Sequence, residues 1–298
     1  MSIYNREALA PRAIASILAQ DFADFEFIVV NDGSTDRTLD VVRGFDDPRI
    51  RVASLPVNSG IPTARNVGLR MARGAFIAQM DSDDFSLPDR LGRQHDFLRA
   101  NPDVHFIGAN ALKIVGETRH ALTYSPDDAV IKARLVSLDA RGMLHPVSMM
   151  RADFLEQHDL LYPMERTDHD HALWTEAMIR GARFSNVEEV LLHHYRHKDN
   201  ATAESGTDYP AHEKRKTALR TNVLCQFFPN HPYEDLRAIA RWMELGRRNS
   251  IPEVCLAIAA IRRALGDTTS YCGESKREVG RILKAQFTAA LEALHRAR

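Results

Sequence analysis

The stretch FEFIVVNDGSTD, residues 25–36, decides the fold class of this chain. Its first half is a short apolar run rich in β-branched and aromatic side chains, which predicts a strand buried on both faces. Its second half supplies Asn, Asp, Gly and Ser, the residues that favour tight turns. Residues 38–45 then predict a helix that closes near Gly44. A buried strand followed by a turn and a helix is the repeating unit of a parallel sheet covered by helices.

Strand and helix patterns repeat twice more before residue 102. Residues 50–55 predict a strand, and the helix that follows carries Pro62 in its first turn. Residues 75–80 predict a third strand. Ser86 and Asp89 resemble the two ends of a capping box at the start of the next helix. We therefore expect an α/β fold with a mostly parallel sheet flanked by helices.

The pattern is looser after residue 102. It predicts strands over 105–115, 145–150 and 187–197, and helices over 125–138 and 168–182. From about Asp208 onward every signal is helical, with apolar positions at helical spacing. We therefore expect an α/β domain over residues 1–205 and a C-terminal helical region over residues 206–298.

Composition and charge narrow the class of protein. The 298 residues are 44% hydrophobic and 27% charged, values typical of a globular protein with a sizeable core. The formal net charge of -1 offers no basic field, so no nucleic-acid partner is expected. The three cysteines match no metal spacing and favour a reducing compartment. Because the first residues lack the apolar centre of a signal peptide and no run of about 18 apolar residues exists, we expect a cytoplasmic protein.

Acidic side chains follow two of the predicted strands. Asp32 follows the strand over 25–30, and Asp81, Asp83 and Asp84 follow the strand over 75–80. In an open parallel sheet, ligands bind beyond the carboxyl ends of the strands. We therefore expect both acidic clusters to lie at one rim of the sheet.

The cluster after the third strand predicts a divalent cation that in turn holds a diphosphate. Asp81 and Asp83 are two positions apart, so on an extended chain their side chains point the same way. Magnesium is typically held by one or two carboxylates together with substrate phosphates. An EF-hand calcium loop would need Gly where Ser86 stands. The alternative is a solvated turn whose last carboxylate favours the helix dipole, and the DGSTD segment can likewise be only a turn.

Four motifs in this order resemble those of the family 2 glycosyltransferases with the GT-A fold. They are YNRE (4–7), VVNDGSTD (29–36), NSGIPTARNVGL (58–69) and MDSDD (80–84). The resemblance covers roughly residues 3–100 and weakens towards residue 200. It implies an enzyme of the hexosyltransferase type that uses a nucleotide-diphospho-sugar donor, a Mn²⁺ or Mg²⁺ ion and a hydroxyl acceptor, with inversion at the anomeric carbon.

The resemblance also implies how the donor is bound. Tyr4 and Asn5 fall in the loop that lines the nucleotide pocket, and Asp32 falls where the family contacts the base, most often uracil. Arg65 lies in the stretch near the nucleotide and its phosphates. The resemblance therefore implies a UDP-sugar as the donor, and a thymidine or guanosine donor is the alternative.

The metal and the diphosphate are assigned in the same way. Asp81 and Asp83 match the family's D-x-D motif, with Asp83 on the metal and Asp81 on the ribose or on the metal through water. Arg196 and His197 stand in an imperfect copy of the family's Y-R-x-H segment. Arg196 would neutralise the leaving diphosphate and His197 would contact the metal or the pyrophosphate. Ordinary packing at a strand end is the alternative for His197.

Inversion needs a general base near the acceptor hydroxyl. Counting back from Trp174, the position of the family's base falls on Asp170, with His169 in place of the usual Glu. Asp168 is the second candidate. The alternative is that both aspartates only favour a helix N-terminus. Trp174 is interpreted as a core residue rather than a sugar platform.

The sequence departs from the family at its start. The family has a buried apolar strand ahead of the Tyr-Asn pair, and here only Met1, Ser2 and Ile3 precede Tyr4. Three explanations are open: an upstream start, a filling of the gap by another segment or chain, or a damaged remnant. We favour the first, which predicts that about six upstream residues raise stability and donor binding.

The leading functional hypothesis is a transferase that builds a surface polysaccharide or glycoconjugate on a saccharide or lipid-linked acceptor. The alternatives are a sugar-phosphate nucleotidyltransferase, whose glycine-rich basic loop is missing here, and a non-catalytic sugar-nucleotide-binding scaffold. The C-terminal helices carry many basic side chains and could mediate a homo-oligomer or peripheral contact with the inner face of the cell membrane. Because the charges alternate in sign, a solvated face is the default interpretation.

Overall fold

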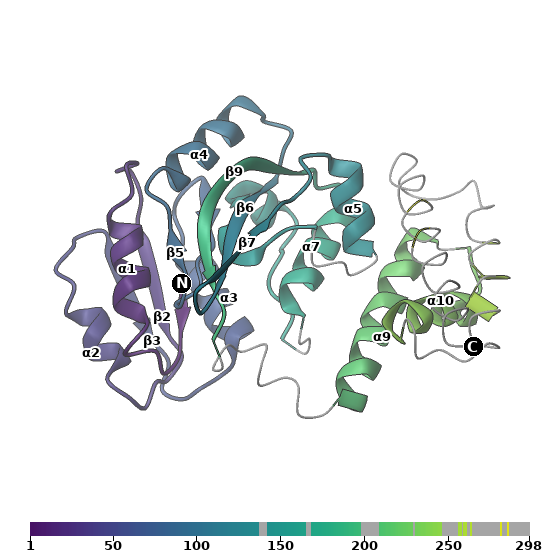
Figure 1. The fold of residues 1–298 in the computed structure, drawn as a ribbon, viewed down its shortest axis with the longest axis horizontal. Coiled ribbons are helices and arrows are strands. Elements are labelled where there is room, and N and C mark those ends of the chain that lie inside the picture. Colours follow the sequence, from purple (N-terminus) through teal and green to yellow (C-terminus); the bar gives the residue numbers. More distant parts are fainter. Residues whose placement is uncertain are drawn as a thin grey trace. The chain divides into compact units, whose positions relative to one another are not determined.

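The structure, a computed structural model, describes residues 1–136, 142–164, 168–197, 209–228 and 230–245, with a few positions between 256 and 285 (Figure 1). The chain divides into two compact units. The first consists of Met1–Asp127, Met143–Glu165 and Glu176–Lys198, and the second of Asp128–Gly142, Arg166–Thr175 and Asp199–Arg298. The predicted domain boundary between residues 205 and 206 lies outside the described residues.

A three-stranded parallel sheet forms the start of the first unit. Strands β1 (Ser2–Ile3), β2 (Phe27–Asn31) and β3 (Ile50–Ser54) pair in that order, with Ser2 opposite Val30. Residues 25–36 therefore form the predicted strand and turn. The parallel arrangement predicted from them is confirmed for this sheet.

Three helices accompany this sheet. They are α1 (Ala10–Leu18), α2 (Thr38–Arg43) and α3 (Ile61–Met71). Helix α3 packs against β1 and β2, and α1 packs against α2 (Figure 1). The buried side chains of α1, Ala10, Ala13, Ile14 and Ile17, recur at helical spacing and enter the core of the first unit.

A second sheet of six strands is mixed. Its order is β4 (Phe76–Ala78), β8 (Met149–Arg151), β6 (Phe106–Val115), β9 (Phe184–Tyr195) and β5 (Phe85–Ser86), with β7 (Thr118–Leu122) paired to β6. Only β6 and β9 are parallel. The turn between β6 and β7 holds Gly116 at φ 58°, and a turn this short joins only antiparallel strands.

Two local predictions are corrected. The strand expected over 145–150 begins at Met149, because His145–Val147 form one turn of 3-10 helix that contains Pro146. The capping box is also wrong. Ser86 belongs to β5 and its hydroxyl accepts a hydrogen bond from Gln20, and α4 (Arg90–Ala100) begins after Asp89 without a side-chain cap.

The remaining helices are α5 (Asp128–Val136), α6 (Ala152–Gln157), α7 (His169–Ile179), α9 (Tyr209–Phe227) and α10 (Tyr233–Leu245). In the second unit α9 packs against α5 and α10. The helical character predicted for the C-terminal region is thus confirmed over the part that the structure describes. None of the described helices is both long enough and apolar enough to span a bilayer.

One contact joins the two sheets of the first unit. Ser2 forms an isolated parallel bridge with Asp81, the third residue after β4 ends. Strand β1 therefore lies between β2 and the segment that follows β4, and this segment carries the acidic cluster.

Candidate functional site

Three carboxylates gather directly after β4. Oxygen atoms of Asp81, Asp83 and Asp84 all lie within 4.8 Å of one another. On the other side of β1, the backbone N–H of Asp32 donates a hydrogen bond to the carbonyl of Ile3 at 2.8 Å. The two acidic clusters therefore flank the carboxyl end of β1, which is the shared rim that the sequence predicts.

Asp81 is held by basic side chains. Its Oδ1 lies 2.9 Å from Nη2 of Arg65 and 3.9 Å from Nδ1 of His145, whose Nε2 lies 2.8 Å from the Tyr162 hydroxyl. Burial opposes ionisation, but the charges of Arg65, His145 and His194 outweigh it and hold the pKa of Asp81 below its ordinary value. Asp81 is therefore an anion near neutral pH.

Asp83 is fixed at both its backbone and its side chain. Its carbonyl accepts a hydrogen bond from Nη2 of Arg12 at 2.6 Å, and the Arg12 guanidinium stacks 3.6 Å above the centre of the Tyr195 ring. Its Oδ2 lies 3.0 Å from Nε2 of His197. The structure thus brings together Asp83 and His197, two of the three residues, with Asp81, that the family resemblance assigns to the metal.

Asp84 anchors the acidic loop to β9. The side chain is fully buried, and its oxygens accept hydrogen bonds from the backbone N–H of Tyr195 at 2.9 Å and contact Nδ1 of His194 at 3.0 Å. Burial raises the pKa of Asp84 to about 6, although the bond to His194 works against it. Burial lowers the pKa of His194, but the bond to Asp84 outweighs it and the net shift is upward.

Asp32 ties the end of β2 to the start of α3. Its Oδ1 accepts the backbone N–H of Ser59 at 2.8 Å and its Oδ2 accepts that of Gly60 at 2.9 Å. The side chain is buried. Each carboxylate oxygen has a second lone pair, so a further donor can still be accepted. The predicted contact of Asp32 with a base stays a prediction.

The loop after β1 and the turn after β2 form one surface. Asn5 adopts φ 47° and its backbone N–H donates to the hydroxyl of Ser34 at 3.0 Å, while its side-chain oxygen accepts the N–H of Thr35 at 2.8 Å. The neighbouring Tyr4 is exposed. The predicted nucleotide-binding residues Tyr4 and Asn5 therefore stand beside the turn that carries Asp32.

The candidate bases belong to the second unit. Helix α7 begins at His169, and Asp168 immediately precedes it. Asp170 lies in the first turn, where its Oδ1 accepts the backbone N–H of His171 at 2.9 Å. This bond is the one expected if Asp170 only favours the N-terminus of α7, and the role of Asp170 as the base stays a prediction. Trp174 is 1% exposed and is a core residue, as interpreted from the sequence.

Arg196 follows the end of β9. Its backbone N–H donates to the carbonyl of Ile114 at 2.9 Å, and its position between Tyr195 and His197 places it on the segment that holds the acidic loop. Sequence reasoning missed Arg12 and His194 as partners of this loop. The only available signal for His194 was the run of histidines in HHYRH, residues 193–197, and nothing in the sequence singled out Arg12.

Comparison with known proteins shows the family and the fold of this chain. Residues 1–159, more than half of the chain, match the family described as "Glycosyl transferase family 2". The chain belongs to glycosyl transferase family 2, which confirms the resemblance drawn from the four motifs.

The chain is similar to two curated bacterial relatives. A protein of Haemophilus influenzae described as "Uncharacterized glycosyltransferase" is 29% identical over 232 residues, which are 74% of this chain and 71% of the relative. The succinoglycan biosynthesis protein ExoO of Rhizobium meliloti is 32% identical over 193 residues, which are 61% of this chain and 56% of ExoO. The chain therefore spans less than two thirds of the length of ExoO.

A solved structure shares the fold. The crystal structure of Staphylococcus aureus TarS, residues 1–349, in complex with UDP-GlcNAc superimposes with a TM-score of 0.65 at 18% sequence identity, over 98% of this chain and 86% of that chain. The predicted GT-A fold is thus confirmed.

Proposed function

We propose that this chain is a metal-dependent inverting glycosyltransferase that moves a sugar from a UDP-sugar to a hydroxyl acceptor. The observation that carries the proposal is the placement of Asp81 and Asp83 on one side of β1 and Asp32 on the other. A nucleotide laid across the end of β1 meets a carboxylate for its base at one end and an acidic cluster for its diphosphate at the other.

The residues of the acidic loop fit a divalent cation. Asp81 and Asp83 present hard oxygen ligands within 4.8 Å of each other, as Mg²⁺ and Mn²⁺ prefer, and His197 is the candidate third protein ligand. A bound ion would neutralise charge on the diphosphate and so favour its departure. The role of Asp84 is different, because both of its oxygens already hold β9, and we assign it to positioning the loop.

Basic side chains complete the donor site. The side chain of Arg65 is 10% exposed and Asp81 orients its guanidinium, a group whose planar N–H donors suit a phosphate or ribose oxygen. Arg196 supplies a second positive charge beside the acidic loop for the leaving diphosphate. Tyr4 and Asn5 border the nucleoside end. These roles are the ones that the family motifs imply.

The transfer itself needs a base beside the acceptor hydroxyl, whose oxygen attacks the anomeric carbon in line with the leaving group. Asp170 takes the proton from the acceptor hydroxyl, the hydroxyl oxygen bonds to the anomeric carbon, and the bond from that carbon to the diphosphate breaks. Attack from the face opposite the leaving group gives inversion. Asp168 is the second candidate for the base.

The relatives suggest the acceptor class. ExoO is named for succinoglycan biosynthesis, and TarS is named as a poly(ribitol-phosphate) β-N-acetylglucosaminyltransferase. We therefore propose a saccharide or lipid-linked acceptor in the synthesis of a surface polysaccharide or glycoconjugate. The competing proposals are a non-catalytic sugar-nucleotide-binding scaffold and a sugar-phosphate nucleotidyltransferase.

Calorimetric titration of UDP with and without Mn²⁺ tests the donor site. Wild type is expected to bind UDP in a metal-dependent manner, and Asp83→Ala is expected to lose that dependence. Asp96→Ala is the matched control, because the side chain of Asp96 is 83% exposed on α4. If folded wild type and folded Asp83→Ala bind UDP equally well in the presence of Mn²⁺, the proposal is wrong.

The variant Asp170→Asn distinguishes the proposal of an enzyme from that of a non-catalytic scaffold. The isosteric amide keeps the shape of the side chain but cannot take a proton. An enzyme should lose transfer by about 100-fold or more while keeping its affinity for UDP. Unchanged transfer in Asp170→Asn would move the base to Asp168, and a lack of transfer by wild type to every acceptor tried would favour the scaffold.

A further inference from the structure

A fully buried arginine stands at the start of α4. Arg90 is the first residue of that helix, and its exposed fraction is 0%. Arginine is almost never buried completely unless it is paired. A positive charge in the first turn of a helix is also unfavourable, because the helix dipole is positive at that end. Neither burial nor helix position favours Arg90, so its surroundings must account for it.

The hydrogen bonds that hold Arg90 within the described residues end on neutral groups. Nη2 donates to the carbonyl of Gln79, Nε donates to Oε1 of Gln94 at 3.1 Å, and Nη1 lies 3.4 Å from the sulfur of Met80. In the part of the chain that the structure describes, no carboxylate oxygen lies within 4.0 Å of the guanidinium nitrogens. The charge of Arg90 is therefore not neutralised by direct contact.

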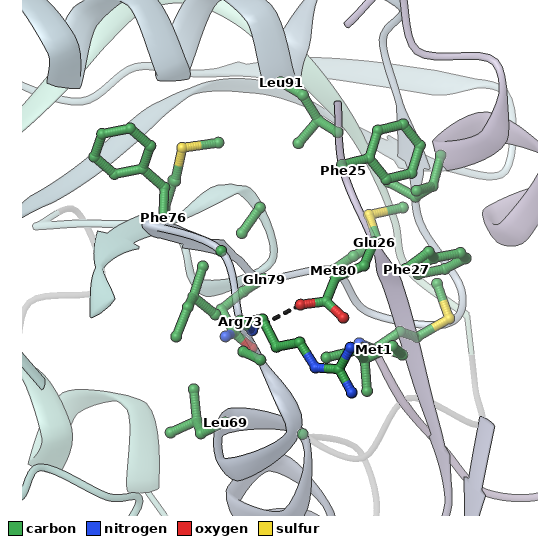
Figure 2. A pocket seen from close by; sticks show the side chains of 18 of the residues that line it. Met1, Phe25, Glu26, Phe27, Leu69, Arg73, Phe76, Gln79, Met80 and Leu91 are labelled. Carbon is green, nitrogen blue, oxygen red and sulfur yellow. Dashed lines mark hydrogen bonds between the residues drawn. The ribbon is translucent and has the colours of Figure 1, made fainter. Parts of the chain in front are cut away.

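Solvent does not offset this charge either. Gln79 and Met80 line a pocket of about 660 Å³ (Figure 2), which has room for water. Arg90 borders the same pocket, but its side chain is fully buried, so solvent does not reach the guanidinium. A buried charge with neither a contacting acid nor water around it depends on charges that lie further away.

The negative charges that meet this need belong to the acidic loop, residues 81–84. Burial lowers the pKa of Arg90 to about 10, and the charges of Asp84 and Asp81 act in the opposite direction. Arg90 therefore stays positively charged near neutral pH. Attraction beyond hydrogen-bond distance remains strong here, because the protein interior has a low dielectric constant and salt screens buried charges little.

The same attraction acts on the acidic loop. Oxygen atoms of its three aspartates lie within 4.8 Å of one another, so the ionised carboxylates repel. Arg65 and His197 contact two of these carboxylates, but both residues are assigned to the donor or its cation. Because Arg90 is buried, it keeps its charge and its contacts whether or not a donor is bound.

Gln94 extends the hydrogen bonds of Arg90 to another segment beside the loop. Its Nε2 donates to the carbonyl of Val147 at 2.6 Å. Val147 closes the 3-10 turn that begins at His145, whose Nδ1 lies 3.9 Å from Oδ1 of Asp81. Buried hydrogen bonds from α4 thus hold both the chain that enters the loop and the turn that lies against it.

We propose that Arg90 is a positioning residue of the donor site, whose buried positive charge holds the carboxylates of the acidic loop together before a cation binds. Its hydrogen bond to Gln79 fixes the chain two residues ahead of Asp81, so charge and geometry act on the same segment. This role rests on the proposed function, because it takes the acidic loop as the site of the cation. Arg90 touches neither donor nor cation and acts through the loop.

A double-mutant cycle measures the charge coupling in the protein without metal or nucleotide. Arg90→Met replaces the charge by a long apolar side chain, and Asp84→Asn removes a charge of the loop but keeps the shape of the side chain. In the Arg90→Met background the attraction between the two charges is already lost. We therefore expect Asp84→Asn to lower Tm by at least about 2 °C less in that background than in wild type. Equal losses in the two backgrounds would overturn the proposal.

Gln94→Leu is the matched control for this cycle. It breaks the same set of buried hydrogen bonds but removes no charge. Its loss of Tm should therefore add to that of Asp84→Asn to within about 1 °C. A coupling as large as that of Arg90→Met would show that the loop responds only to the packing of α4, and the proposal would be wrong.

Two further substitutions keep the test decisive if Arg90→Met does not fold. Arg90→Lys keeps the charge and loses the planar fork of N–H groups, whereas Arg90→Gln keeps a hydrogen-bond donor and loses the charge. The lysine variant should be the more stable, by at least about 3 °C in Tm. A glutamine variant as stable as the lysine variant, or a lysine variant that does not fold, would contradict the assigned role.

Ligand binding distinguishes positioning of the loop from a purely structural role. A bound cation supplies positive charge to the same carboxylates, so the deficit in Tm of the folded charge-free variant, Arg90→Met or Arg90→Gln, should shrink by about half or more in saturating UDP and Mn²⁺. An unchanged deficit would mean that Arg90 serves the fold alone. If wild type itself gains no Tm from UDP and Mn²⁺, the proposed function fails, and the cycle with Asp84→Asn still decides whether Arg90 acts on the loop.

Discussion

Asp84 and His194 form a buried pair that joins the acidic loop to the end of β9. The carboxylate is fully buried and its Oδ2 lies 3.0 Å from Nδ1 of His194, although the two residues are 110 positions apart in the chain. The same carboxylate accepts the backbone N–H of Tyr195. The geometry of the loop, and hence the spacing of Asp81 and Asp83, depends on this pair.

Asp84→Ala should destabilise the protein rather than only inactivate it. Removing one partner of a buried hydrogen-bonded pair leaves the other unpaired and costs about 3 kcal/mol or more of the free energy of unfolding. Asp83→Ala, in the same loop, should cost less than about 1 kcal/mol while abolishing metal-dependent UDP binding. Urea unfolding of the two variants checks this contrast, and similar losses of stability in both would refute it.

Arg65→Ala should weaken UDP binding by roughly 10-fold or more, because it removes the guanidinium that Asp81 orients. Arg65→Lys keeps the charge but loses the fork of N–H groups, so we expect it to recover only part of the affinity. Calorimetric Kd values measured at one ionic strength separate the two variants. Full recovery by lysine would show that only the charge matters.

Gly33 is expected to tolerate no side chain. It adopts φ +66°, and a Cβ there would lie 2.3 Å from the carbonyl carbon of Val57. Gly33→Ala should therefore cost about 3 kcal/mol or more from strain and overlap together. Gly116→Ala is the matched control, because Gly116 has a similar φ of +58° but open space around it, and should cost about 1 kcal/mol. Chemical denaturation of both variants measures the difference, and equal costs would show that the turn after β2 relaxes.

The buried amino group of Met1 predicts a pH dependence of stability. Its pKa falls from 8.0 to about 5 in the folded state, so between these values the unfolded chain binds a proton that the folded chain does not. The free energy of unfolding should therefore rise with pH from 5 to 8, by up to about 1.4 kcal/mol per pH unit from this group. Below pH 5 and above pH 8 the contribution is constant.

N-terminal acetylation isolates that effect. The acetylated chain has no charge at this position but keeps Asp84, His194 and every other titrating side chain. Subtracting its stability curve from that of the free amine should leave a rise confined to pH 5–8. A flat difference curve would show that the amino group reaches solvent in the folded state.

The sequence predicted the elements whose signal is local. The strand and turn over residues 25–36, the helix that starts near Pro62 and the acidic rim follow from periodicity, turn chemistry and the order of strands. These local signals did not predict that the second sheet is mixed. Strand β8 joins that sheet by pairing with β4 and β6, which lie in distant parts of the chain. The family motifs assigned roles to site residues, and those roles remain predictions.

The rest of the site depends on contacts that no local pattern records. Arg12 donates a hydrogen bond to the backbone carbonyl of Asp83, which is 71 positions away in the chain. In the sequence alone, Arg12 cannot be told from a solvent-facing arginine near the start of a helix. Ser86 fits a capping pattern in the sequence, but in the structure it belongs to β5 and pairs with Leu192 of β9. Tertiary pairing overrode the local preference in each of these cases.

The bridge from Ser2 to Asp81 gives the first unit a seam between its two sheets. Asp32 directly follows β2 on one side of the seam, and Asp81 lies in the segment after β4 on the other. A nucleotide that touches both would act as a clamp, and the two sheets would then open together rather than separately. Amide hydrogen exchange should therefore slow on both sides of the seam when UDP and Mn²⁺ are bound, well beyond the residues that the ligand contacts.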